Sequence, residues 1–343
     1  MSKPKITYWF GAGASYQSVP LQKELSIEMR NFSTQIEEHI KFLKNDYPNR
    51  EYVETLEHFN SKFRELIENS KALGTVDTLA RKYWLTRKDR DLNFLRLCVD
   101  VFITWWQHAN KLAYAKDEKY SELDSRYIGL LSVLMDRNSQ GFAALEDDVN
   151  FLSYNYDLQL ETALCDMLSL YIEDSHKYEN LLSNYDFTRS QGFSKKRIVH
   201  LNGHSSFQFD QVGRTFPLFQ NDQLKDSTMF YARLAQLMDK QSGHSKVAND
   251  ILYAWEMDQG KMERVKELIS KTDYLVIIGY SFPSFNRKID RQILSLINEN
   301  CKVIYQDNFP QKEAFESILP HDAINRIEYK NEVEQFFIPP EFF

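Results

Sequence analysis

The chain has 343 residues, which is enough for one large domain or two ordinary ones. Hydrophobic residues make up 43% of the chain and include 24 Phe and 19 Tyr, so a substantial core can form. The net charge of −7 at pH 7 gives no general reason to expect a polyanionic partner, and direct binding of nucleic acid is not expected.

Cysteine usage and apolar runs limit the class of protein further. Cys98, Cys165 and Cys301 lie far apart and form no Cys-x-x-Cys pair, so a structural zinc site, or any other metal, is not expected. A sparse, odd cysteine count is typical of a reducing compartment and favours a cytoplasmic location. The first strand signal begins almost at the N-terminus, so no signal peptide is expected. The longest apolar run, residues 274–280, is too short to span a bilayer, and no membrane partner is expected.

The first strand signal ends in closely spaced glycines. Residues 5–11 contain a run of β-branched and aromatic residues that ends in glycine, which predicts a buried strand, and Gly11-Ala-Gly13-Ala-Ser15 stands at its end. Such glycines let a phosphate approach the backbone at a helix N-terminus, so this turn predicts a bound nucleotide. The dehydrogenase fingerprint would need a third glycine where Tyr16 stands, and the Gly-Lys-Ser/Thr of a P-loop is missing. A tight turn without a ligand is the alternative interpretation.

Helical periodicity dominates the sequence from residue 21 to residue 140. Residues 51–70 and 89–115 have apolar side chains at three- and four-residue spacing, with charged residues between them. The buried face of the second segment should contain Phe102, Ile103, Trp105 and Trp106. We therefore expect a large helical insertion over residues 21–140.

Strand signals return after the insertion and alternate with helical segments. The expected strands are residues 150–154, 197–201, 273–279, 302–307 and 326–329. The expected helices are residues 157–173, 228–241, 246–257, 261–271 and 287–298, with a loop over 205–226. This alternation is typical of an α/β fold with a Rossmann-like, doubly wound parallel sheet. Residues 1–20 and 141–343 are expected to form this domain.

Small or polar residues follow the expected strands. They are Gly11 to Ser15, Tyr154-Asn155-Tyr156-Asp157, His200-Leu-Asn202-Gly203-His204, Gly279-Tyr280-Ser281 and Asp307-Asn308. Ligands of open parallel sheets bind at the carboxyl ends of the strands. We therefore expect these residues to converge on one crevice.

Four of these blocks resemble those of the SIR2-like NAD-binding family, in particular its prokaryotic branch found in anti-phage defence proteins. The blocks are Gly11-Ala-Gly13-Ala-Ser15 with Pro20, Ser153-Tyr-Asn155-Tyr-Asp157 with Glu161, His200-Leu-Asn202-Gly203, and Ile278-Gly279-Tyr280-Ser281-Phe-Pro283 with Asp290. Their order and spacing agree with the family from residue 5 to about residue 308. Sirtuin deacetylases also have a zinc module, and the missing cysteine pairs argue against that activity here.

The resemblance implies an NAD⁺ hydrolase that cleaves its substrate NAD⁺ to ADP-ribose and nicotinamide during abortive-infection defence. Control of such a toxic activity implies a homo-oligomer or a separately encoded defence partner. The alternative is a non-catalytic subunit of a defence complex that binds NAD⁺ or ADP-ribose. A third option, a nuclease subunit, would need a metal site, and Glu146-Asp147-Asp148 is the only dense carboxylate group. That run is more simply a loop or a helix start.

Nucleotide contacts are expected from the glycine loop and from the other strand ends. The residues are Gly11, Ala12, Gly13, Ser15, Asp157, Asn202, Gly203, Gly279, Ser281 and Asn308. Asp157 is expected to accept the nicotinamide amide N–H, to cap the helix that it opens, or both. Asn308, with Asp307, is expected at the adenine ribose or in a turn.

The catalytic prediction depends on Asn155 and a histidine. An amide at a strand tip needs partners, and Asn155 is suited to bind a carboxamide and water. Asn202 stands where the family has its histidine, and an amide cannot take a proton. His200, on the same strand face about 6.6 Å deeper, is the first choice of general base. His204, in the loop beyond and free to swing, is the second.

Apolar residues close the chain, and the expectation is that this tail packs on its own domain. They are Phe336, Phe337, Ile338, Phe342 and Phe343. An interface with another chain is the alternative.

Overall fold

The computed structural model describes residues 3–46, 52–108, 120–137, 143–167, 197–209, 215–242 and 248–343. The chain forms two compact units. The first contains residues 1–18, 123–203 and 252–343, and the second contains residues 19–122 and 204–251.

The first unit is built on a six-stranded sheet in which all neighbouring strands are parallel. The strands are β1 (Ile6–Phe10), β4 (Val149–Ser153), β5 (Ile198–His200), β9 (Tyr274–Ile278), β10 (Lys302–Gln306) and β11 (Ile327–Lys330). Their order is β11-β10-β9-β1-β4-β5, so the chain begins in the middle, adds strands on one side and then on the other. This is the order of a doubly wound sheet, and it confirms the α/β fold predicted from the sequence.

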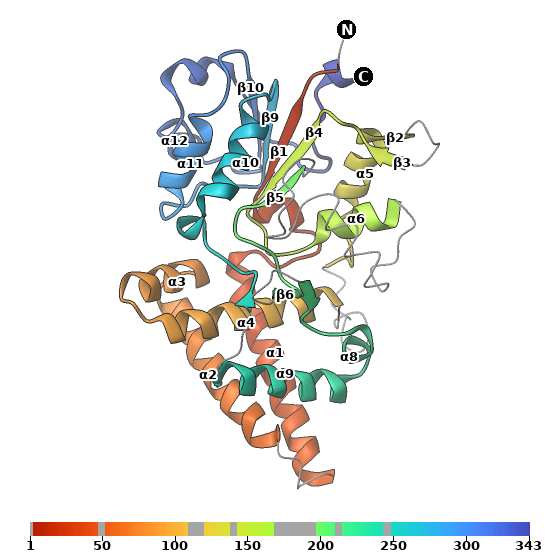
Figure 1. Cartoon of the computed structure of the whole chain (residues 1–343), viewed down its shortest axis with the longest axis vertical. Coiled ribbons are helices and arrows are strands. Elements are labelled where there is room, and N and C mark those ends of the chain that lie inside the picture. Colours follow the sequence, from red (N-terminus) through yellow and green to blue (C-terminus); the bar gives the residue numbers. More distant parts are fainter. Residues whose placement is uncertain are drawn as a thin grey trace. The chain divides into compact units, whose positions relative to one another are not determined.

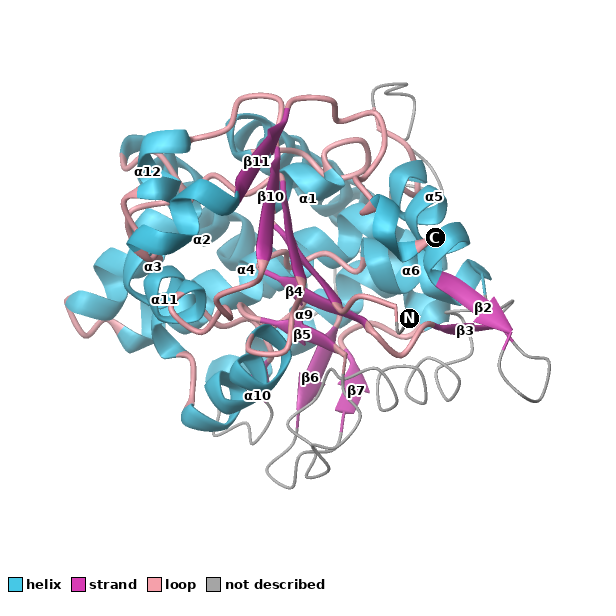
Figure 2. Cartoon of the chain, turned by 90° about the horizontal axis from the view of Figure 1, so that it is seen from above, coloured by secondary structure: helices cyan, strands magenta, loops and turns pink. Residues whose placement is uncertain are grey.

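Helices cover both faces of this sheet (Figures 1 and 2). One face has α10 (Gln259–Ile269), α11 (Arg287–Leu294) and α12 (Lys312–Glu316), and the other has α5 (Ser125–Leu134) and α6 (Gln159–Met167). A hairpin of β2 (Met135–Arg137) and β3 (Ala143–Leu145) follows α5. Short 3-10 helices are η1 (Ala12–Ser15), η2 (Ala254–Glu256), η3 (His321–Arg326) and η4 (Pro340–Phe342).

Strand β1 is the centre of the core. All five of its residues are buried, as expected for a strand that is covered on both faces. Trp9 packs on the rings of Tyr154 and Tyr280 at centroid distances of 5.9 and 5.7 Å, on the side of α10, α11 and α12. Phe10 packs on the opposite side against Phe151 at 5.8 Å. The aromatic run that predicted a buried strand therefore supplies both layers of the core.

The apolar C-terminal residues pack within the first unit, as expected, except Phe343, which is 82% exposed. The Phe336 ring lies 5.6 Å from the Phe10 ring and 5.0 Å from the Tyr127 ring, and Phe342 is buried. The side chain of Gln306, at the end of β10, donates hydrogen bonds to two backbone carbonyls of the tail. The tail therefore completes the core beside β1 and β10.

The second unit is mainly helical. Its helices are α1 (Gln22–Asp46), α2 (Tyr52–Ala72), α3 (Val76–Leu85), α4 (Asp89–His108), α8 (Asn221–Lys225) and α9 (Ser227–Ser242). A small antiparallel sheet of order β7-β6-β8 contains β6 (Phe207–Phe209), β7 (Thr215–Pro217) and β8 (Ala248–Asn249). Its core is rich in aromatic rings, and it includes all four residues predicted for the buried face of α4: Phe102, Ile103, Trp105 and Trp106.

The extent of the helical unit differs from the expected insertion of residues 21–140. Residues 204–251 also belong to it, because α9 packs on α2 and β8 packs on α4. Residues 123–140 belong instead to the sheet unit, because α5 packs on α6. These contacts join segments that are far apart in the sequence, so local periodicity did not indicate them.

One helix prediction is wrong in its described part, and two others extend past the described residues. The helix expected over 246–257 is wrong for residues 248–257, which contain β8 and η2. Residues 246–247 lie outside the described residues. So do the last residues of the helices expected over 89–115 and 157–173, whose described parts are α4 and α6.

Three glycines let the loops after β1 and β9 interlock. The Gly13 N–H donates to the Gly279 carbonyl and the Gly11 N–H donates to the Ile278 carbonyl, both at 2.9 Å. Gly279 has φ of +62°, and a Cβ built on it would lie 2.4 Å from the Gly13 carbonyl carbon and from the Ala14 nitrogen. Backbone packing therefore requires glycine here, whether or not a phosphate binds.

We predict that Gly279→Ala lowers the free energy of unfolding by about 2 kcal/mol or more, because the left-handed backbone alone costs roughly 1–2 kcal/mol. The matched control is Gly129→Ala in α5, where a Cβ would meet nothing within 4 Å. Alanine favours a helix over glycine, so this control should be neutral or more stable by about 1 kcal/mol. Urea denaturation measures both, and equal stability of the two variants would contradict the interlock.

Candidate functional site

The candidate site lies at the carboxyl ends of β1 and β9, where the two halves of the sheet meet. Doubly wound sheets bind their ligands at this switch point. The interlocked glycines lie here, and Ala12 beside them is exposed. Ser15, at the end of η1, is fully buried. The glycine loop therefore reaches from the surface into the polar cluster described next.

A buried arginine holds the glycine loop. Arg126 of α5 is 3% exposed, and its Nη2 donates to the carbonyl oxygens of Gly13 and Ala14 at 3.3 and 3.0 Å. The guanidinium also forms a two-point ion pair with the fully buried Asp124, at 2.9 and 2.6 Å, which compensates for burial of its charge. Sequence analysis missed both residues, because a charged residue at the start of a helix is usually exposed or a cap.

Ser15 joins the glycine loop to the end of β4. Its Oγ donates to Asp157 Oδ1 at 3.0 Å, accepts from Asn155 Nδ2 at 3.2 Å, and lies 3.0 Å from the Tyr127 hydroxyl. The structure thus brings three predicted site residues into direct contact. No described residue donates to Oδ1 of Asn155 or to Oδ2 of Asp157, so both oxygens can accept from a ligand.

Asp157 also caps a helix, as the sequence allowed. Its Oδ1 accepts the N–H of Gln159, the first residue of α6, at 3.2 Å. Burial raises the pKa of Asp157 to about 6, against the lowering effect of the hydrogen bonds from Gln159 and Ser15. A carboxyl group with this pKa is mostly ionised at neutral pH and remains a usable base.

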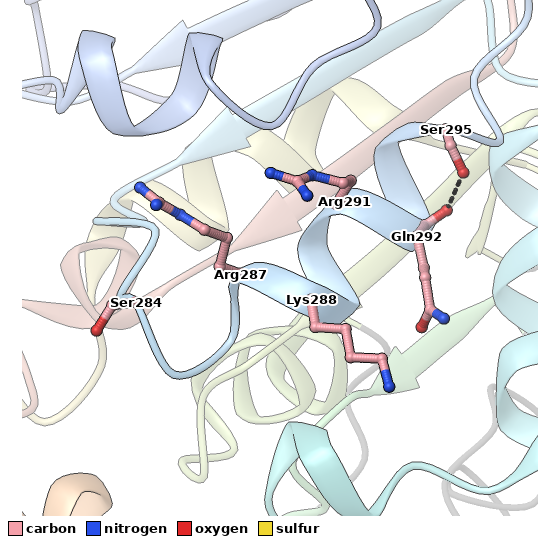
Figure 3. A pocket seen from close by; sticks show the side chains of 6 residues that line it. All are labelled: Ser284, Arg287, Lys288, Arg291, Gln292 and Ser295. Carbon is pink, nitrogen blue, oxygen red and sulfur yellow. Dashed lines mark hydrogen bonds between the residues drawn. The ribbon is translucent and has the colours of Figure 1, made fainter.

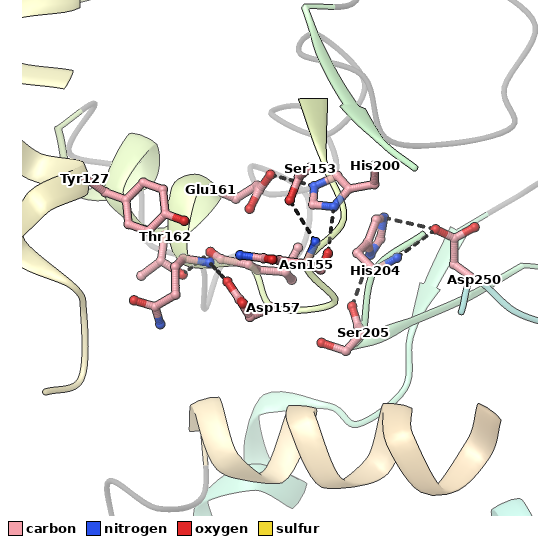
Figure 4. A network of polar contacts seen from close by, with 12 residues as sticks. Tyr127, Ser153, Asn155, Asp157, Glu161, Thr162, His200, His204, Ser205 and Asp250 are labelled. Carbon is pink, nitrogen blue, oxygen red and sulfur yellow. Dashed lines mark hydrogen bonds and ion pairs between the residues drawn. The ribbon is translucent and has the colours of Figure 1, made fainter. Parts of the chain in front are cut away.

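His200, the last residue of β5, is held between two oxygens (Figure 4). Its Nε2 lies 2.9 Å from Glu161 Oε1, and its Nδ1 lies 3.3 Å from the backbone oxygen of Asn155. Glu161, in α6, is fully buried. Both ring nitrogens of His200 therefore face protein oxygens, so neither is free to take a proton from a substrate while these contacts hold.

Asn202 and Gly203 form the turn after β5. Asn202 Nδ2 donates to the Tyr154 carbonyl at 3.1 Å, and Gly203 has φ of +68°, which favours glycine. The Oδ1 of Asn202 is buried and has no hydrogen-bond partner within the described part of the chain. A buried oxygen without a donor costs about 1–3 kcal/mol, so a ligand N–H or a water is the ordinary compensation.

A second polar cluster ties the ends of β4 and β9 to α11. Asp290 accepts from the Tyr154 hydroxyl at 2.7 Å and from the Tyr280 hydroxyl at 2.9 Å, and Asn286 donates to Tyr280 at 3.1 Å. Asp290 is fully buried, and burial raises its pKa to about 7. Burial also raises the pKa of both tyrosines, so they remain hydrogen-bond donors. This cluster fixes the strand ends beside the site.

The contacting residues Ser15, Asn155 and Asp157 are called the Ser15 cluster below. Three predicted residues, Ser281, Asn308 and His204, make no described contact with it. Ser281 and Asn308 are exposed after β9 and β10. His204 belongs to the second unit, where it is fully buried rather than free to swing. Its backbone N–H donates to Asp250 Oδ2 at 3.2 Å, and its Nε2 lies 3.6 Å from the same oxygen (Figure 4).

The acidic run considered for a nuclease makes ion pairs. Glu146 lies 2.6 Å from Lys3, and Asp147 lies 3.9 Å from Arg197. Within the described ranges, no group of three His, Cys, Asp or Glu side chains is placed to hold a metal ion.

Among the described helices, none has the length and hydropathy needed to cross a membrane.

No protein-family model and no curated protein matches the chain. Similar solved structures include "Sir2 bound to acetylated peptide", with 10% identity, a TM-score of 0.33, and coverage of 61% of this chain and 65% of that chain. A Sir2 complex with an inhibitor, 2′-O-acetyl-ADP-ribose and a deacetylated p53 peptide has 10% identity, a TM-score of 0.32, and coverage of 61% and 66%. The chain therefore spans slightly less than two thirds of each of these structures. At these values the similarity says nothing about ligand or activity.

The two raised carboxyl pKa values predict a pH-dependent stability. An unfolded aspartate titrates near pH 4, whereas Asp157 and Asp290 titrate near 6 and 7 in the folded chain. Between these limits the folded state binds more protons, so the free energy of unfolding falls as pH rises, by up to about 1.4 kcal/mol per pH unit for each group.

We predict that Asp290→Asn makes this decline shallower between pH 5 and pH 7, by up to about 1.4 kcal/mol per pH unit. The variant keeps an acceptor for the tyrosines but removes the titrating carboxyl group. Asp258→Asn is the matched control, because Asp258 is an exposed helix cap. Urea denaturation across this range gives the slopes. The same slope in wild type and Asp290→Asn would contradict the raised pKa of Asp290.

Proposed function

We propose that the chain binds NAD⁺ at the carboxyl ends of β1 and β9 and hydrolyses it to ADP-ribose and nicotinamide. The observation that supports this most strongly is the contact of Ser15, Asn155 and Asp157 at the carboxyl ends of β1 and β4, beside the switch point of the sheet. Nucleotides bind at the switch point of doubly wound sheets. In addition, no described residue donates to Oδ1 of Asn155 or to Oδ2 of Asp157. The four sequence blocks that resemble the SIR2-like family include these residues, which supports NAD⁺ as the nucleotide.

The reaction breaks the bond between the nicotinamide nitrogen and ribose C1′. The bonding electron pair leaves with the nitrogen, so the cationic ring becomes neutral nicotinamide and positive charge develops on the ribose. A water oxygen bonds to C1′ and releases one proton. The leaving group therefore needs orientation and no acid, whereas the attacking water needs a proton acceptor.

Asn155 and Asp157 are the residues expected to touch the reacting groups. The Asn155 Oδ1 can accept a hydrogen bond from the nicotinamide amide or from the attacking water. The Asp157 carboxylate, with its pKa of about 6, can take the proton of that water at neutral pH. Its negative charge also stabilises the cationic ribose in the transition state.

His200 and Glu161 fit a positioning role. The contact of His200 Nδ1 with the Asn155 carbonyl holds the backbone of the residue that faces the substrate, and Glu161 holds the other ring nitrogen. Because both nitrogens face oxygens, His200 would have to give up one contact to act as a base. The base role of His200 stays a prediction, and the geometry favours Asp157.

Asn202 favours a second candidate function, a subunit that binds NAD⁺ or ADP-ribose without cleaving it. Its side chain stands where the related family has a histidine, and its buried Oδ1 has no donor among the described residues. A bound ligand would satisfy this oxygen, but an amide adds no proton acceptor. Binding of NAD⁺ without release of nicotinamide would identify this case.

The cellular role is proposed from the sequence resemblance alone. Uncontrolled loss of NAD⁺ is toxic, so we propose that hydrolysis waits for assembly of a homo-oligomer or for a separately encoded partner. In this proposal the protein acts in the cytoplasm and depletes NAD⁺ during phage infection.

We predict that the purified protein, alone or with the product of a neighbouring gene, releases nicotinamide from NAD⁺. Asn155→Ala should reduce the rate by about 100-fold or more, the usual loss when a group that contacts the transition state is removed. Asn300→Ala, which removes an exposed amide of the same unit, should leave the rate unchanged. No release under any activating condition would rule out the hydrolase.

The pH profile distinguishes the two candidate bases. If Asp157 is the acceptor, kcat should rise as pH increases through about 6 and then level off, because the carboxylate must be ionised. Asp157→Asn should abolish the rise, whereas His200→Gln should lower kcat at every pH but preserve its rise with pH. A rise that persists in Asp157→Asn and disappears in His200→Gln would make His200 the base.

A further inference from the structure

Helix α11 has a cationic groove on its exposed face (Figure 3). The groove has a volume of about 600 Å³, and its lining residues are Ser284, Arg287, Lys288, Arg291, Gln292 and Ser295. All of them are exposed, whereas Asp290, Ile293 and Leu294 of the same helix are buried. The helix therefore packs on the sheet with one face and presents three cations on the other.

These cations are not neutralised by any described residue of the protein. None of the side chains of Arg287, Lys288 and Arg291 has a hydrogen bond or an ion pair with a described residue, whereas Arg264 and Arg326 are paired. Figure 3 shows the guanidinium groups of Arg287 and Arg291 on the same side of the helix. Like charges four residues apart on a helix repel each other and reduce stability. An anion between them would remove this cost.

The groove suits a compact anion with several charges. Arginine binds phosphate oxygens through two parallel hydrogen bonds, and the two arginines lie about 6 Å apart along the helix. The lining has no aromatic residue, so the bases of a single-stranded nucleic acid would have nothing to stack on. A long polyanion would also extend onto a protein with a net charge of −7.

We propose that this groove binds a small ligand with two or more contiguous phosphate groups, as in tripolyphosphate or a nucleoside triphosphate. Its six lining residues take no part in the Ser15 cluster. The proposal is therefore independent of NAD⁺ hydrolysis.

Isothermal titration calorimetry of the full chain with tripolyphosphate tests it. Arg287→Ala and Arg291→Ala should each weaken binding by about tenfold or more, as expected for loss of a charge-assisted hydrogen bond. Lys266→Ala, which removes an exposed charge of α10, is the matched control and should change the Kd by less than about twofold. Both arginines are exposed and have no partner among the described residues, so the variants should melt no lower than wild type, and circular dichroism checks this.

Titrations with ATP and with a single-stranded oligonucleotide complete the design. Tighter binding of ATP than of tripolyphosphate supports a nucleotide ligand, and equal binding supports recognition of the phosphate chain alone. The proposal is overturned if neither ligand binds, if Lys266→Ala weakens binding as much as the arginine variants do, or if the oligonucleotide alone binds.

Discussion

The close contact between the loops after β1 and β9 is the constraint on which the site depends. These strands are neighbours at the middle of the sheet, and the chain can cross there only if Gly11, Gly13 and Gly279 have no side chains. Arg126 then holds the carbonyl groups of the β1 loop, and the loop delivers Ser15 to Asn155 at the end of β4. Glycines that alone indicated a phosphate site are thus needed first to bring the strand ends together.

The sheet could be predicted from the sequence because its strands are short apolar runs with turn residues at their ends. The β1 run, for example, is buried on both faces, and such runs are recognisable without knowledge of their neighbours. The assignment of residues 204–251 to the helical unit could not be predicted, because it depends on packing of α9 on α2. The error at 248–257 has the same origin, since pairing of β8 with β6 replaces a local helical pattern.

The site was predicted in part for a similar reason. Strand ends locate Asn155, Asp157 and the glycines, because parallel strands bring their carboxyl ends to one edge. The partners of these residues were missed: Arg126 comes from a segment that the sequence placed in the insertion, and Tyr127 beside it contacts Ser15. Glu161 was noticed only as part of a motif, and its contact with His200 depends on how α6 packs against β5. The spacing of residues along the chain does not predict which side chains of different elements will contact each other.

The central claim is that a nucleotide binds at the crossing of the β1 and β9 loops. Hydrogen–deuterium exchange of the full chain with and without NAD⁺ tests this most directly, because a ligand protects the amides that it covers or stabilises. The account predicts slower exchange with NAD⁺ in peptides that cover residues 8–16 and 153–161. Unchanged exchange in both peptides, at NAD⁺ concentrations that saturate binding, would contradict it.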